Sequence, residues 1–122
     1  MKKFRFRQFP VYKDACLFRI QARDIAKKSF PKSEQFCLTS QLLRALNSII
    51  LNIAEGADRG TDKDFANFLN YSHTSVNEVV ACMDIALSDC YITEKEHEEI
   101  LLHAEKLANQ LTAFRKKIIS DI

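Results

Sequence analysis

The stretch TSQLLRALNSIILNIAEG, residues 39–56, decides the fold that this sequence predicts. Its spacing is that of one α-helix, because its larger polar side chains recur within a band roughly 80° wide at about 100° per residue. We call this band the polar seam, and here it consists of Gln41, Arg44, Ser48, Asn52 and Glu55. Most of the remaining helix surface is apolar and must be covered. We therefore predict a helix buried on most sides, and the alternative is an ordinary amphipathic helix with a short polar face.

Three further helices are predicted around this one. The first is expected from about Tyr12 to Ser29, and Thr39 is the expected N-cap of the second. The third should begin after Thr61 and run to about Ser88, and the fourth should begin at a capping box formed by Thr93 and Glu96. The connections are short, so successive helices must be antiparallel neighbours. The predicted fold class is all-α, an antiparallel up-down-up-down four-helix bundle.

Composition agrees with a single helical domain over residues 1–122, with residues 1–10 as an N-terminal arm. The chain has only two glycines and two prolines, which favours helices over a turn-rich β fold. Its four cysteines have no CxxC spacing and are expected to be reduced cytosolic thiols. No apolar run resembles a signal peptide or spans a bilayer. We therefore expect a soluble, cytoplasmic protein without membrane contact.

The residues of this stretch and of its flanks also carry a family resemblance. The matching positions are Ser40-Gln41, Arg44-Ala45, Ser48-Ile49, Asn52-Ile53-Ala54-Glu55-Gly56, Val11-Tyr12, Ala15, Phe30-Pro31-Lys32, Leu38-Thr39-Ser40, Phe65, Phe68-Leu69, Ser75, Glu78, Ala86-Leu87 and Tyr91-Ile92. Over roughly residues 9–119 the chain resembles the four-helix-bundle proteins encoded in intervening sequences of bacterial large-subunit ribosomal RNA genes. It departs from their pattern at Leu43, at Ile50-Leu51 and at Val80.

The resemblance implies more than the fold. Similar proteins form ring-shaped homopentamers, so it implies that this chain is its own partner in a pentamer. A related bundle, the accessory variability protein of diversity-generating retroelements, is a basic barrel of five subunits that works with RNA and a reverse transcriptase. The resemblance therefore implies polyanion binding, by analogy of fold.

Charge is distributed unevenly along the chain. The formal net charge is +2, but residues 1–32 carry ten basic groups against two acidic ones, whereas residues 33–122 carry eight basic and fourteen acidic groups. Such a split indicates either a polyanion partner or attraction between helices or subunits.

Basic and aromatic side chains alternate over the first nine residues, which predicts an extended arm lying outside the core. A basic ridge also recurs every four residues along the first helix. The candidate nucleic-acid-binding residues are Lys2, Lys3, Arg5 and Arg7 in the arm and Arg19, Arg23 and Lys27 on the ridge. The phenylalanines of the arm, Phe4, Phe6 and Phe9, could stack on unpaired bases or dock on a neighbouring subunit, and the sequence leaves both open.

The polar seam has an expected counterpart on the third helix. Folding that helix back should place Arg44 beside Ser75 and within reach of Glu78. We interpret Arg44 and Glu78 as a buried ion pair that sets helix register, in preference to a binding or catalytic pair. Ser75 and Glu78 complete the polar seam.

Catalysis finds little support in the sequence. Carboxylate-bridged di-iron bundles need a Glu-x-x-His motif on two helices, and the motif occurs once, at residues 94–97. No glycine-rich phosphate loop and no nucleophile with an evident partner is present. We predict no catalytic residues, no metal, no cofactor and no enzymatic activity. The expected function is an oligomeric bundle that binds nucleic acid, RNA before DNA. The alternative is an oligomeric scaffold that binds a partner protein without nucleic acid.

Overall fold

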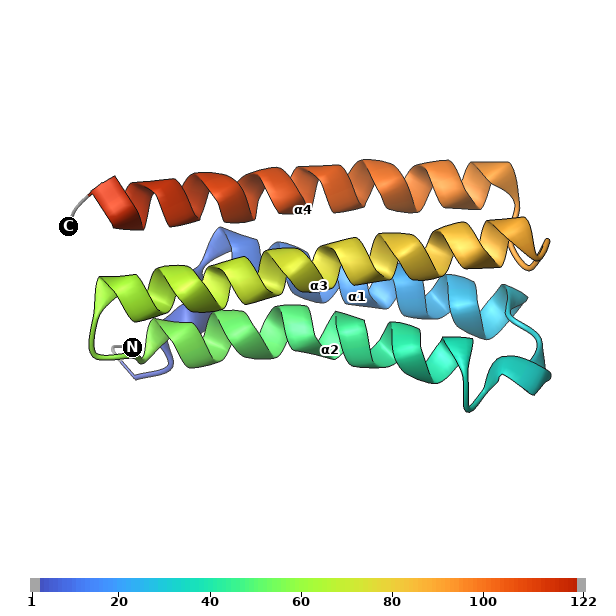
Figure 1. Ribbon diagram of the computed structural model, residues 1–122, viewed down its shortest axis with the longest axis horizontal. Helices are drawn as coiled ribbons and strands as arrows, with labels where there is room; N and C mark the ends of the chain where they lie inside the picture. Colours follow the sequence, from blue (N-terminus) through green and yellow to red (C-terminus); the bar gives the residue numbers. More distant parts are fainter. Residues whose placement is uncertain (1–2, 121–122) are drawn as a thin grey trace.

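The computed structural model describes residues 3–120 and is all-helical over that range. Two short 3₁₀ helices, η1 (Arg5–Gln8) and η2 (Lys32–Glu34), accompany the α-helices. The four α-helices are α1 (Pro10–Ser29), α2 (Leu38–Ala57), α3 (Asp62–Ser88) and α4 (Glu94–Ser120). Successive helices run in opposite directions (Figure 1), which confirms the predicted antiparallel bundle.

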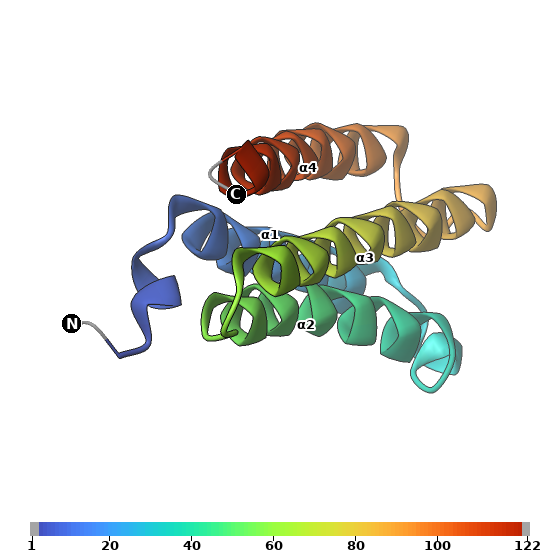
Figure 2. The ribbon, with the colours of Figure 1, turned by 60° about the vertical axis from the view of Figure 1, so that its left-hand side comes forward.

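The arrangement around the bundle follows from which helices touch. α2 and α4 each pack on both α1 and α3, whereas α1 and α3 lie diagonally across the bundle. Side-chain contacts give the direction of α1 against α4, because Asp14 meets His103 near one end and Ser29 meets Glu96 near the other. The N-terminal segment with η1 stands beside the ends of α1 and α2 (Figure 2).

The core is built from the apolar stripes of all four helices. Side chains that are almost completely buried include Phe18, Leu46, Ile53, Leu69, Met83 and Leu107. On α1 the apolar stripe consists of Ala15, Phe18, Ala22 and Ala26, which are buried, and of Ile25, which is only partly covered.

α2 and α3 approach each other closely at their connected ends. A Cβ added to Gly56 would lie 2.6 Å from the Cβ of Phe68 and 3.0 Å from Cδ1 of Phe65. Further along, the Ser72 hydroxyl donates a 2.8 Å hydrogen bond to the Ile49 carbonyl. α2 nevertheless has a solvent-exposed side, on which Leu51 is 63% exposed. Within one chain, α2 is therefore amphipathic: Gln41, Arg44, Asn47, Leu51 and Glu55 are exposed, and its other fifteen residues are buried or partly covered.

Two of the three predicted N-terminal caps are confirmed. Thr61 accepts a hydrogen bond from the Asp64 amide as the N-cap of α3. At α4, the Thr93 hydroxyl accepts from the Glu96 amide, and the Glu96 carboxylate accepts from the Thr93 amide in return. The bond from the Thr93 amide is the main reason that the pKa of Glu96 lies below its usual value.

The predicted N-cap of α2 was wrong. α2 begins one residue before Thr39, and its N-cap residue Cys37 makes no side-chain hydrogen bond. Glu34 serves this end instead, because one carboxylate oxygen accepts from the Leu38 amide at 3.2 Å. Its other oxygen accepts from the Tyr91 hydroxyl at 2.7 Å, and this bond raises the pKa of Tyr91 to about 12. The α1–α2 connection is thereby tied to the α3–α4 turn.

We predict that Gly56→Ala destabilises the protein by about 1–3 kcal/mol, because its methyl group would meet a Cβ that cannot move without its backbone. Urea denaturation measures the free energy of unfolding. Gly60→Ala is the matched control, since nothing lies within 4 Å of its added Cβ. Equal effects of the two substitutions would contradict the close approach of α2 and α3.

Candidate nucleic-acid interface

The N-terminal arm is not extended, contrary to the sequence prediction. Arg5–Gln8 form η1, and Phe4 before it has a left-handed backbone with φ 58°. The cause is packing: the Phe9 ring lies 5.2 Å from that of Phe114, and the Phe6 ring lies 5.0 Å from that of Tyr12. The arm therefore folds back onto its own bundle and is not separate from the core.

This packing changes what the arm phenylalanines offer to a partner. Phe6 and Phe9 are partly buried against the core of their own chain. Their packing is therefore neither stacking on a base nor docking on a neighbouring subunit, the two roles that the sequence left open. Phe4 is 62% exposed and is the one arm phenylalanine whose ring remains largely free in the chain. Stacking on a base and docking on a subunit both stay predictions for Phe4.

Arg5 is engaged in the structure of the arm. Its Nη2 and Nε both donate to the Ala57 carbonyl, at 2.7 and 3.2 Å, and so satisfy the C-terminal end of α2. Its guanidinium carbon also lies 5.5 Å from the ring centre of Phe9 and 5.6 Å from that of Phe65. Arg5 keeps its charge, but its position is fixed.

The ridge residues of α1 differ in their partners. Arg19 donates through Nε to the Asn47 side-chain oxygen at 2.8 Å, a neutral partner that leaves the positive charge uncompensated. Arg23 makes an ion pair of 3.2 Å with Asp24. Lys27 is exposed, as are Lys3 and Arg7 in the arm. Lys2, the remaining candidate, lies outside the described residues.

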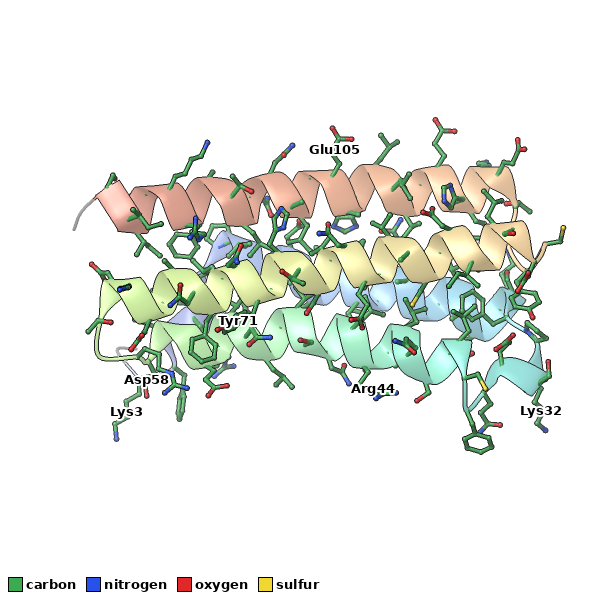
Figure 3. All side chains as sticks on the ribbon, viewed as in Figure 1. Lys3, Lys32, Arg44, Asp58, Tyr71 and Glu105 are labelled. Carbon is green, nitrogen blue, oxygen red and sulfur yellow. The ribbon has the colours of Figure 1, made fainter. Side chains whose placement is uncertain are left out.

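The basic groups of the N-terminal third do not form one compact patch. Lys3 and Lys32 lie at opposite ends of the molecule (Figure 3). The twenty residues of α1 between the two groups span roughly 30 Å. At the C-terminal end of α1, the acidic first turn of α4 lies nearby, because Lys28 contributes to lowering the pKa of Glu96. The positive charge is thus a band along α1 with its least compensated part toward the N-terminus.

The short side chains of the polar seam form a network between α2 and α3. The Ser75 hydroxyl donates to that of Ser48 at 2.8 Å. The Asn52 amide donates to the Ser48 hydroxyl at 3.0 Å and to the Ser48 carbonyl at 2.8 Å. These residues lock the register of the two helices. The other members lie outside the network: Gln41 is exposed, and Glu55 pairs with Arg59 at 2.7 Å.

The predicted buried ion pair between Arg44 and Glu78 was wrong. Both side chains are exposed, Arg44 extends away from the bundle (Figure 3), and no ion pair joins the two among the described residues. The physical reason is register: Ser75 faces Ser48, one helical turn from Arg44. The hydroxyl pair fills the inner part of the polar seam, and the two long charged side chains remain hydrated on the surface.

A polar cluster between α1 and α4 was missed. The Asp14 carboxylate is 8% exposed and lies 2.9 Å from Nε2 of His103 and 3.7 Å from Nζ of Lys106. The other ring nitrogen of His103 contacts the Gln21 side-chain oxygen. One oxygen of Asp14 has no hydrogen-bond partner. The sequence feature that could have revealed this cluster is Asp14, an acidic residue beside Ala15 in the apolar stripe of α1.

Neither a metal site nor a membrane-spanning helix is found within residues 3–120. No group of three or more histidine, cysteine, aspartate or glutamate side chains in that range could hold a metal ion. None of the helices described has the length and apolar composition needed to cross a bilayer.

Fold and surface together define a small four-helix-bundle protein with a positively charged first helix. Residues 7–113 match the family model of the 23S rRNA-intervening sequence protein, so the chain belongs to this family. This agrees with the resemblance seen in the sequence. No curated protein matches the chain.

A solved structure supports the same fold. The chain is similar to a protein with unknown function from the S23 ribosomal protein family of Bacteroides thetaiotaomicron, whose crystal structure is known at 1.70 Å resolution. The TM-score is 0.76 at 23% sequence identity, and the match covers 87% of this chain and 98% of the other.

We predict that Asp14 and His103 are coupled. Replacing both by alanine, singly and together, should give an interaction free energy of roughly 1–3 kcal/mol in urea denaturation, because each single change removes the 2.9 Å contact from a partner that is buried or partly buried. The same cycle on Arg44 and Glu78 is the control. It should be additive, with single effects within about 0.5 kcal/mol, because both side chains are exposed. Additivity at Asp14 and His103 would contradict the contact.

Proposed function

We propose that this protein is a non-enzymatic, oligomeric helical bundle that binds nucleic acid, RNA before DNA, through the basic surface of the arm and α1. The observation that carries the proposal is a set of exposed cations without a carboxylate partner among the described residues: Lys3, Arg7, Lys13 and Lys27. Cations of this kind are available to neutralise phosphates and to release the counterions that these hold.

Self-association fits the exposed apolar side chains. Leu17 is 60% exposed on α1, Leu51 is 63% exposed on α2, and Phe4 is 62% exposed on the arm. Covering such side chains in an assembly is favourable by about 25 cal/mol per Å² removed from water. A ring would also repeat the α1 cations once per subunit and so build a longer positive band. The number five comes from the resemblance to ring-forming relatives.

A second candidate is a scaffold that binds a partner protein and no nucleic acid. Phe36 favours it, because this side chain is 86% exposed in the α1–α2 connection, away from the basic arm. An aromatic side chain so exposed is suited to insertion into a pocket of another protein.

Nucleic-acid binding should depend steeply on salt. For single-stranded RNA, log affinity should fall linearly with log salt concentration, with a slope near −0.7 for each phosphate contact. Replacing Lys3, Arg7 and Lys27 by Gln should make this slope shallower by about 0.7 for each residue that contacts a phosphate. Fluorescence anisotropy with a labelled oligonucleotide measures both quantities.

The matched control replaces Lys63, Lys95 and Lys116 by Gln, which removes the same charge from exposed positions on α3 and α4. This control should retain the salt slope of the unmodified protein. Phe4→Ala should lower the affinity for single-stranded RNA more than the affinity for duplex, since a duplex has no unpaired base that could stack on the ring. Failure of the unmodified protein to bind RNA or DNA at low salt would leave the scaffold function as the better account.

The protein should not be a monomer. Light scattering at micromolar concentration should give a mass several times that of the 14.1 kDa chain. Leu17→Glu together with Leu51→Glu should shift the mass toward one chain, because charges would enter the apolar contact, and circular dichroism should show an intact helical fold. A monomer for the unmodified protein would refute the oligomer.

A further inference from the structure

An aromatic pocket lies at the end of the bundle where the arm folds back. It has a volume of about 560 Å³ and lies between the arm, the first turn of α1, the start of α3 and the last turns of α4. Its apolar wall includes Phe9 from the arm, Phe65 from α3 and Phe114 from α4. Pockets of about 300–1,000 Å³ with apolar walls and a few polar groups are typical of small-molecule sites.

The three rings form one packed unit. Phe114 stands edge-on to both others, with ring centres 5.2 Å from Phe9 and 5.5 Å from Phe65. Phe9 and Phe65 are stacked at 6.1 Å. Phe9 contributes to the wall from the last residue before α1, and Arg5 contributes to the lining from η1. A planar ring entering the pocket would find aromatic surface against which to pack.

Positive charge lies at the rim. Arg5 is held over Phe9 and Phe65 by its hydrogen bonds to Ala57, so its position costs no further ordering when a ligand binds. Lys117 also lines the pocket and is exposed. Asp62 is the acidic side chain of the lining, so the described rim carries a net positive charge and favours an anionic ligand.

A polar group of the lining lacks a partner. The Gln110 side-chain oxygen is buried and accepts no hydrogen bond from the protein, which is unfavourable until a donor reaches it. The terminal torsion of glutamine is soft, so the amide can turn toward a ligand. An amide offers a donor beside an acceptor, which is the pattern that the edge of a nucleobase complements.

We propose that the aromatic pocket binds a nucleoside monophosphate unit, with its base against the phenylalanines and the Gln110 amide and its phosphate beside Arg5 and Lys117. The unit is either a free nucleotide or the 5′-terminal nucleotide of a strand. The second case rests on the proposed function and deepens it. Inorganic phosphate alone does not suit the apolar wall, and an uncharged hydrocarbon uses neither the amide nor the cations.

Calorimetric and NMR titrations test the ligand class. Adenosine and uridine 5′-monophosphates should bind, adenosine should bind more weakly, and ribose 5-phosphate should bind at least ten-fold more weakly than either nucleotide. Equal binding of ribose 5-phosphate and a nucleotide would overturn the proposal, as would absence of nucleotide binding. A 5′-phosphorylated oligonucleotide and its circular form distinguish the two sources, since only the former has a 5′-terminal nucleotide to insert.

Variants test the place of binding. Ala113 is exposed and lines the pocket, so Ala113→Trp should fill the space and lower nucleotide affinity at least ten-fold. Lys117→Gln should lower it about three- to five-fold, as expected for one exposed ion pair. Lys116→Gln is the matched control, because Lys116 is exposed next in sequence but does not line the pocket. Equal effects of these two lysine variants would overturn the placement of the phosphate.

Gln110→Met separates binding from folding. It removes the unpaired buried oxygen, so stability of the ligand-free protein should stay the same or rise, while nucleotide affinity should fall. Unchanged affinity would overturn the role of the amide. If long RNA binds and Ala113→Trp leaves its affinity unchanged, the pocket fails as a strand-end site while the proposed function stands. If nucleotides bind and long RNA does not, the proposed function fails while the pocket stands.

Discussion

The close approach of α2 and α3 is the constraint on which the rest of the bundle depends. It requires glycine at position 56, because a side chain there would meet Phe68. It also brings the Ser72 hydroxyl to the backbone of α2, where it donates a hydrogen bond to the Ile49 carbonyl. Ser48 and Ser75 then pair across the same interface. Because hydroxyls buried without partners would each cost about 1–3 kcal/mol, other registers of the two helices are disfavoured. α1 and α4 complete the bundle by covering the apolar side of this fixed pair.

Side-chain length decides which polar residues of α2 are structural. Serine and asparagine are short enough to bond within the interface, whereas Arg44 and Glu55 reach water at little cost. A buried ion pair would have had to offset the desolvation of both charges, and a hydroxyl pair avoids this. The guanidinium group of Arg44 consequently remains at the surface. The exposed cations of the arm and α1 support the proposal that this surface binds a polyanion.

Periodicity predicted the fold because helix, apolar stripe and cap are local properties of the sequence. The four helices and the capping box at Thr93 and Glu96 followed from spacing alone. The Arg44–Glu78 pair failed because helix register depends on contacts between distant residues, here Ser48 with Ser75. The extended arm failed for the same reason, since alternation along the chain does not reveal that Phe114 offers Phe9 a site. The aromatic pocket could not be predicted, because its walls come from three helices.

The folded arm gives the basic N-terminus a structural role as well as a charge. Arg5 satisfies the end of α2, and Phe9 belongs to the packed rings at the end of the bundle. Deleting the arm would therefore expose Phe65 and Phe114 and leave the Ala57 carbonyl without its partner, so loss of binding after truncation would not identify a contact. Single charges such as Lys3 and Arg7 are exposed and can be neutralised without disturbing these contacts. The electrostatic binding proposed for the arm can therefore be tested separately from its packing only by substitutions that keep Arg5 and the phenylalanines in place.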